Sequence, residues 1–430
     1  MELLVRAHSR ARWSVVGLVL ATTLNAASPP LASDAAPPAL RDAVRDVWSR
    51  NPAVQSAESR LAAAQAQAEA AGQPLYNPDL DLAAENADVD TRSVGLSQTI
   101  DWSGKRQARE TAATADVRAA AAERDEVRRR VALDWLRGFA GLQMAAEQAA
   151  VGARRVDLLD QFAALADRRF REGDIAVLER DLAALAAHEA RAQQAVLVAE
   201  QAKARQTLIG VGGHGEGLPP LPATLPASSD TSNVASSVDS LPALRRARAE
   251  TEAAQARIAV AERDRRPDPT IALTAGRVTS PFNDRLIGIA VRIPLFVRNS
   301  YSAEVSAARS NADAAQATQQ NLALQANAEL ERAASSYDAL RAACLAWEQS
   351  RAPSAGERAQ LLQRLWEAGE ISAADYLVQL KQSADTELAA MSLRARAWQA
   401  WADWLDASGR FETWLGIGDE FAKTSGELPR

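Results

Sequence analysis

The sequence predicts a mainly α-helical protein with a small β contribution, built from one unit that occurs twice. Two similar turns, at 170–175 and 366–371, carry the repeat, and an Ala/Leu-rich helical run follows each of them. A long helical stretch precedes each turn. Each helical stretch is preceded by a pair of short segments that alternate apolar and polar residues. The first pair lies near 79–102 and the second near 268–296. The expected unit is therefore strand–strand–long helix–turn–helix.

The N-terminus has the three-part pattern of a secretory signal peptide over residues 1–27. Arg6, Arg10 and Arg12 precede an apolar stretch at 13–24 that is too short to span a bilayer. Small residues follow, so cleavage is expected within about 26–33. The alternative is a cytosolic protein with a basic start.

Charge and cysteine content exclude several classes of protein. The formal net charge is -6, with both signs interleaved along the chain, so no basic face for nucleic acid is expected. The single Cys344 allows no intramolecular disulfide, and no cysteine is expected at the N-terminus left after cleavage, where a lipid would be attached. After the signal no run of 18 apolar residues occurs, so any membrane crossing would use β-strands.

The helical segments follow in order along the chain. A helix over 40–72 is expected to kink at Asn51-Pro52, because proline lacks an amide donor. The Gly-, Pro- and Ser-rich stretch 210–240 is expected to link the two units. Further helices are predicted over about 103–170, 176–209 and 241–264, with domains over 40–209 (first repeat), 241–410 (second repeat) and 411–430 (C-terminal tail).

Four alternating segments predict strands with one apolar face. The last of them, 286–296, places Ile287, Ile289, Val291, Ile293 and Leu295 on one side, after a turn expected around 280–284. Branched apolar residues opposite a solvated face are typical of a membrane β-barrel wall. An ordinary soluble sandwich is the alternative, but it needs more strands than this chain supplies.

The residues at the strand-to-helix junction resemble a known family. Asn77 and Pro78 precede the first strand, and Gln98 leads into Gly104, Lys105 and Arg106. Together with the duplicated Gly-acid-Ile turns, these motifs make the chain similar to the TolC family of outer-membrane efflux proteins. The Gln98 to Arg106 segment most resembles the outer-membrane subunits of heavy-metal and cation efflux pumps of the RND type.

The resemblance implies a homotrimer in the outer membrane of a Gram-negative bacterium. Each chain would contribute four strands to a 12-stranded β-barrel and its helices to a periplasmic α-barrel. The implied partners are a periplasmic adaptor protein, an inner-membrane pump of the RND type, and outer-membrane lipid. The cysteine that anchors many relatives through a lipid is missing.

The two turns are expected to join antiparallel helices at the periplasmic end and to dock the adaptor. Glycine suits such a turn because helices commonly end in a left-handed residue. By resemblance, acids at the start of the returning helix, Asp375 and the equivalent Glu179, line the closed aperture, although Val378 replaces a second acid. The alternative is that both acids complement helix dipoles. The docking residues are Gly173, Asp174, Ile175, Gly369, Glu370 and Ile371.

No catalytic constellation, metal site or cofactor is expected. His188 and His214 are too few and too isolated for a metal cage, and no strand–elbow–helix context surrounds a nucleophile. Trp398, Trp401, Trp404 and Trp414 are expected to pack at the barrel–helix junction or to contact the membrane interface, with a ligand box as the alternative.

The predicted function is a passive exit duct, because no energy-coupling motif such as a Walker A loop is present. Metal cations or other small toxic solutes are the expected cargo, a preference that rests on the resemblance. Drug export or type I secretion is the alternative within the same class. A periplasmic coiled-coil scaffold without a pore is the alternative from another class.

Overall fold

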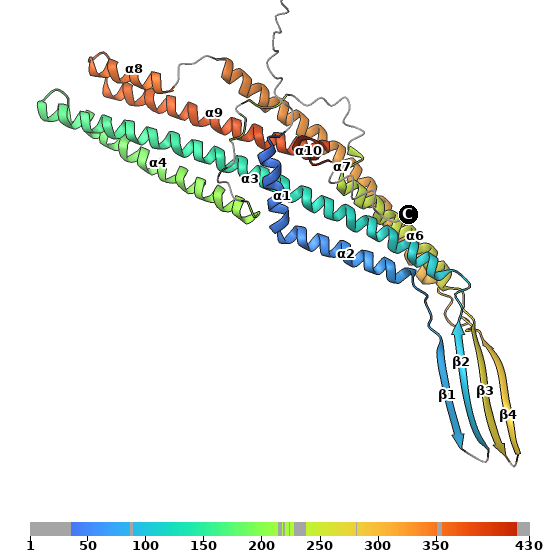
Figure 1. The fold of residues 1–430 in the computed structure, drawn as a ribbon. Helices are drawn as coiled ribbons and strands as arrows, with labels where there is room; N and C mark the ends of the chain where they lie inside the picture. Colours follow the sequence, from blue (N-terminus) through green and yellow to red (C-terminus); the bar gives the residue numbers. More distant parts are fainter. Residues whose placement is uncertain are drawn as a thin grey trace, which may run out of the picture. The chain divides into compact units, whose positions relative to one another are not determined.

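The computed structural model describes residues 36–418 except 87–88, 214–216, 218–219, 223, 228–237, 281 and 351–354. The predicted signal peptide, part of the linker and the last residues of the tail lie outside the described residues. The described part is mainly helical with one four-stranded sheet, which confirms the predicted fold class (Figure 1). None of the described helices is both long and apolar enough to cross a membrane.

The order strand–strand–helix–turn–helix occurs twice, as the repeat predicts. The first copy comprises α1 (Pro38–Arg50), α2 (Pro52–Gly72), β1 (Asp79–Asn86), β2 (Asp90–Thr99), α3 (Lys105–Glu172) and α4 (Val177–Gly210). The second comprises α6 (Pro242–Asp264), β3 (Thr270–Ser280), β4 (Phe282–Arg292), α7 (Ser302–Gln349), α8 (Ala355–Glu367) and α9 (Ala373–Ser408), followed by α10 (Phe411–Leu415).

The predicted break at Asn51-Pro52 is confirmed and separates α1 from α2. The Asn51 side chain accepts a hydrogen bond from the Ala53 amide at 2.9 Å, and Pro52 occupies the first helical position. This is a favourable helix start, because a capping oxygen satisfies one free amide and proline has no amide to leave free. Asn51 Nδ2 also donates to the Val211 carbonyl, at 2.9 Å, which ties the start of α2 to the end of α4.

The two copies differ in their long helix. In the first copy α3 runs without a break over 68 residues. In the second copy α7 ends at Gln349 and α8 begins at Ala355. Pro353 falls in this interval of the sequence, where a proline cannot supply the amide that a continuous helix needs.

The tryptophans of α9 and α10 pack in a core around the middle of α3, not at the strand–helix junction as predicted. Trp398, Trp401 and Trp404 are buried in one cluster with Leu133 and Trp135 of α3. Leu133 lies 28 positions after the start of α3 at Lys105, which is about 42 Å along the helix axis. The interpretation as packing residues is confirmed, while the position near the barrel is wrong. Trp414 of α10 is buried in the same cluster.

A second, separate core lies near the two turns. Phe162 of α3 stacks on Tyr376 of α9 with ring centroids 4.5 Å apart, and also packs against Trp366 of α8 at 4.6 Å. Ala166 and Ala183 are fully buried beside these rings, because alanine allows helices to approach closely. The turn regions of both copies therefore share one small core.

The four strands form one antiparallel sheet in the order β1-β2-β3-β4. The turn predicted around 280–284 is confirmed in position, since β3 ends at Ser280 and β4 begins at Phe282, but it is narrower than predicted because Asn283 and Asp284 lie within β4 and pair with β3. Polar composition suggests a loop, yet both faces of these strand ends are exposed, so polar side chains are tolerated there. The strand predicted over 286–296 ends at Arg292, two residues before Pro294, which has no amide to donate to a ladder.

Candidate functional site

The pairing register places nearly all the alternating apolar residues of the four strands on one face of the sheet. Leu82 of β1 pairs with Val94 of β2, Val94 with Ala275 of β3, and Ala275 with Ile287 of β4. Directly paired residues of an antiparallel sheet lie on the same face. A second row of the same kind consists of Leu80, Leu96, Leu273 and Ile289. We call this side the apolar face.

The opposite side of the sheet carries mostly small or polar side chains, with Val278 and Leu286 as exceptions. Ser93 pairs with Gly276 on this side, and Ser97 pairs with Ala272. Thr99 and Thr270 share a hydrogen bond between their hydroxyl groups at 2.8 Å. We call this side the polar face.

The apolar face is uncovered within the described chain. Ile287 and Ile289 are 85% and 74% exposed, and Val291 is exposed as well. Ile293 and Leu295 are also exposed, but they lie beyond the end of β4, so their predicted membership of the strand is corrected. Large branched side chains in this number do not normally remain in water.

A buried ion pair joins the sheet to the long helix at the predicted family motif. Lys105 Nζ lies 3.0 Å from Asp268 Oδ2, and the two side chains are only 9% and 3% exposed. The Tyr76 hydroxyl donates to the same oxygen at 2.8 Å. Burial, and then this hydrogen bond, raise the pKa of Tyr76 to about 12, so the hydroxyl keeps its proton at neutral pH.

Asp101 and Gly104 start the long helix at this junction. The Asp101 carboxylate accepts hydrogen bonds from the amides of Lys105 and Arg106, both at 2.8 Å. Burial opposes ionisation of Asp101, but these amides outweigh it and lower its pKa. Gly104 adopts a left-handed conformation with φ 71°, which favours glycine.

Other motif residues of the junction make backbone contacts. Gln98 is the polar member of the cross-strand row that it forms with Ile271 and Val291 on the apolar face. Its Nε2 donates to the carbonyls of Tyr76 and Thr99. Arg106 donates to the Gly72 carbonyl at 2.9 Å. Asn77 and Pro78 form the link before β1.

Three residues of the junction, Asp101, Asp268 and Tyr76, were not predicted from the sequence. An acid three residues before Gly104 was a visible helix-start signal, whereas the Tyr76–Asp268 contact spans 192 positions.

The two Gly-acid-Ile turns have the same backbone geometry. Gly173 and Gly369 are left-handed, with φ 83° and 76°. The amide of Asp174 donates to the carbonyl of Arg169, and the amide of Glu370 to that of Leu365, each at 2.9 Å. This pattern is the Schellman motif, in which a left-handed residue ends the helix. The predicted need for glycine is thereby confirmed.

The flanking residues of the turns divide into exposed acids and half-buried isoleucines. Asp174 and Glu370 are exposed, while Ile175 and Ile371 pack against the small core beside the turns. Arg169 stacks over Trp366 at 4.6 Å from the ring centroid and donates to the Glu367 carbonyl at 2.9 Å. The first turn is therefore held against the second.

Ser372 caps the start of α9. Its Oγ accepts from the Asp375 amide at 3.1 Å and donates to the Asp375 carboxylate at 2.7 Å. Asp375 is exposed in the first turn of α9, and Glu179 occupies the first turn of α4. Both positions favour an acid through the helix dipole, which agrees with the interpretation that these acids complement helix dipoles.

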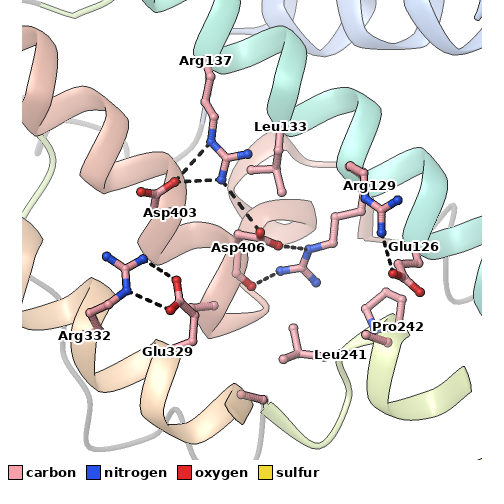
Figure 2. A pocket seen from close by; sticks show the side chains of 14 residues that line it. Glu126, Arg129, Leu133, Arg137, Leu241, Pro242, Glu329, Arg332, Asp403 and Asp406 are labelled. Atoms are coloured by element: carbon pink, nitrogen blue, oxygen red, sulfur yellow. Dashed lines mark hydrogen bonds and ion pairs between the residues drawn. The ribbon is translucent and has the colours of Figure 1, made fainter. Parts of the chain in front are cut away.

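A charged cavity of about 310 Å³ lies between α3, α6, α7 and α9 (Figure 2). Arg137 donates to Asp403 at 2.8 Å, and Arg129 donates to Asp406 and to the Leu405 carbonyl. Arg129 thereby satisfies carbonyls at the C-terminal end of α9, where a positive charge is favourable. The charged residues that line the cavity form ion pairs with described residues. These pairs hold the surrounding helices together, so the lining offers no free charge to a ligand.

No group of three or more potential metal-ligating side chains occurs in the described part of the chain. His188 lies on α4, where its ring contacts Arg191 at 3.4 Å. His214 lies outside the described residues.

A family model described as outer membrane efflux protein matches residues 43–214 and 236–410. Because this covers more than half of the chain, the chain belongs to the outer membrane efflux protein family, whose members are channels and not enzymes. No curated protein matches it.

Solved structures with the same fold include three outer-membrane proteins. VceC of Vibrio cholerae is 20% identical with a TM-score of 0.70, over 86% of this chain and 96% of that chain. The CmeC channel of Campylobacter jejuni is 16% identical with a TM-score of 0.72, over 91% and 89%. The MtrE channel of Neisseria gonorrhoeae, in an open state, is 19% identical with a TM-score of 0.68, over 86% and 89%.

Replacement of Lys105 by Met should destabilise the assembled protein by about 3–5 kcal/mol, because it leaves a buried carboxylate without its cation. Removing both charges, with Lys105→Met and Asp268→Leu, should restore most of this loss. The measurement is the urea concentration that unfolds the purified protein in detergent. Arg109→Gln is the control, because it breaks an exposed pair with Asp264 and should cost less than about 1 kcal/mol. A double variant as unstable as the single one would contradict the role of this pair.

Proposed function

We propose that this protein is the outer-membrane channel subunit of a tripartite efflux system and serves as a passive exit duct. The observation that carries the proposal is the sheet with one apolar and one polar face maintained across all four strands. A wall between lipid and water requires this division. Membership of the outer membrane efflux protein family supports the same conclusion.

The chain would act as a homotrimer. The sheet order leaves the outer edges of β1 and β4 without a partner strand in the described chain. Unpaired edges are costly in lipid, so the edges must pair with other copies. Three copies would close a 12-stranded barrel, while four strands alone enclose no water-filled lumen.

A periplasmic adaptor and an inner-membrane pump of the RND type would complete the system, in a Gram-negative outer membrane. The adaptor would dock on the Gly173 and Gly369 turns, because their acids are exposed and their backbone is shaped alike. Metal cations or other small toxic solutes are the proposed cargo, on the resemblance of the Gln98 to Arg106 segment. Drug export and type I secretion remain the alternatives.

Two experiments separate the channel from a periplasmic scaffold without a pore. A channel should stay in the membrane fraction after mild lysis without detergent, and the purified protein should produce discrete conductance steps in planar bilayers. A scaffold would be released in soluble form and would leave the bilayer silent. A deletion strain challenged with a panel of metals and drugs then identifies the cargo.

Ile289→Arg should impair assembly in the membrane, because it places a charge on the proposed lipid-facing side. The expected cost is about 2–4 kcal/mol if the residue lies near the bilayer midplane. The yield of heat-modifiable protein in the membrane fraction measures it. Ala290→Arg is the matched control, since the adjacent residue lies on the polar face and should tolerate arginine. Equal yields from both variants would refute the assignment of the faces.

Gly369→Val should abolish resistance in a complemented deletion strain while leaving assembly intact. Valine in a left-handed conformation costs about 1–2 kcal/mol and would distort the docking turn, although no atom lies within 4 Å of the added carbon. Gly141→Val is the control, because it lies in equally open space within α3 without a positive φ. Loss of assembly in Gly369→Val would refute the docking role.

Asp375→Asn should reduce cation preference in planar bilayers, if this carboxylate lines the aperture. The reversal potential under a salt gradient measures the preference. Asp313→Asn removes an exposed acid of α7 and should leave the reversal potential unchanged. An unchanged value for Asp375→Asn as well would leave the carboxylate only its role in capping α9.

A further inference from the structure

Three arginines lie in one row across the sheet. Arg92 of β2 pairs directly with Arg277 of β3, and Arg277 pairs directly with Arg285 of β4. Neighbouring strands are about 4.8 Å apart, and like charges directly opposite each other destabilise a sheet. All three side chains are exposed. We call this set the arginine row.

The arginine row lies on the apolar face, at its limit. Arg92, Arg277 and Arg285 are each two positions from a member of the row formed by Leu82, Val94, Ala275 and Ile287, and side chains two apart on a strand share a face. On the other side of the arginine row, toward the hairpin ends, the same face carries Asn86, Asp90, Thr279 and Asn283. The arginine row therefore marks the change from apolar to polar side chains.

No carboxylate neutralises the arginine row in the described part of the chain. Asp90 is the nearest acid on the same face, and it makes no ion pair with any of the three arginines among the described residues. Instead, the arginines border an open hollow of about 600 Å³ together with Leu82, Val94 and Ala275. The hollow thus combines apolar side chains with three positive charges that form no ion pair with any described residue.

The position of the arginine row fits the surface of a bilayer. β4 ends at Arg292, seven positions after Arg285, and an extended strand of that length spans at most about 24 Å. A strand tilt of about 40° reduces this to about 18 Å along the membrane normal, which fits within the apolar band of membrane barrels, about 25 Å, with the arginine row at one limit. Arginine on a lipid-facing side is tolerated near an interface and costly at the midplane.

We propose that Arg92, Arg277 and Arg285 bind the phosphate groups of lipid headgroups in the outer leaflet. The inference rests on the proposed channel function, which places the apolar face in lipid. The helices lie at one end of the strands and the hairpins at the other (Figure 1), so hairpins that point away from the periplasm reach the outer surface. Arginine suits this partner, because its planar guanidinium binds phosphate through two parallel hydrogen bonds.

The occupant is a phosphorylated lipid and not a free anion, because apolar side chains adjoin the charges. Acyl chains would cover Val94, Ala275 and Ile287, while the lipid phosphates would bind the adjacent arginine row. Basic residues at an anionic membrane surface each contribute roughly fivefold to binding. Three arginines in one row should therefore give a preference of roughly a hundredfold for lipids with exposed phosphates.

The test measures lipid retained by the full-length assembled protein in detergent, by native mass spectrometry. The probes are bisphosphorylated lipid A and dephosphorylated lipid A with the same acyl chains. The unchanged protein should retain the bisphosphorylated form at least tenfold better, and Arg92→Gln/Arg277→Gln/Arg285→Gln should lose this preference. Arg292→Gln is the matched control, because Arg292 lies on the polar face and its loss should leave retention unchanged.

Two further variants keep the test decisive if the triple variant does not assemble. Arg277→Gln alone should weaken retention roughly fivefold, and Arg277→Lys should fall between this variant and the unchanged protein. Equal retention of both lipid A forms, or full retention by the arginine variants, would overturn the proposal. So would displacement of lipid A by inorganic phosphate at an equal molar ratio.

Conductance separates this inference from the proposed function. If the unchanged protein and the arginine variants both conduct in phosphatidylcholine bilayers while lipid A retention shows no phosphate preference, only the lipid site is wrong. If the unchanged protein neither inserts nor conducts, the channel itself is wrong.

Discussion

A single chain leaves its sheet with two unpaired edges and an uncovered apolar face within the described residues. The four strands pair in sequence and leave two open edges, and the branched side chains of the apolar face have nothing to cover them within the described chain. A cut sheet of this kind is unstable alone in either solvent, because edges need partner strands and the apolar face needs an apolar medium. In the proposed channel, neighbouring copies would pair with the open edges and lipid would cover the apolar face.

The junction between the sheet and the helices, by contrast, is stabilised by contacts within the chain itself. Within a few residues, Lys105 neutralises Asp268, Tyr76 donates to the same carboxylate, and Asp101 caps the long helix. These contacts join α3, which follows β2, to the segment that precedes β3. The two copies of the repeat are therefore fixed to each other at the junction between the strands and the helices.

Much of this architecture could be predicted from the sequence, because its signals are local. Pro52, Gly173 and Gly369 punctuate the helices, and the alternation around Ile287 to Val291 fixes the faces of β4. The turn expected at 280–284 is narrower in the structure, because Asn283 and Asp284 pair with Thr279 and Val278 of the same hairpin. The larger error arose where residues far apart in the sequence determine the packing. The tryptophans of α9 pack on the middle of α3, more than 250 positions away in sequence, which no local pattern reveals. The row formed by Arg92, Arg277 and Arg285 exists only through the register.

The two cores along the helices differ in kind. The core around Trp135 and Trp401 gathers residues from α1, α3, α7, α9 and α10, whereas the core around Phe162 and Tyr376 is small and lies beside the turns. Local opening costs less free energy where fewer apolar contacts must separate. Amide protons near the turns should thus exchange with solvent through partial openings that leave the central core closed, so that the end of the helices can change shape without unfolding the protein.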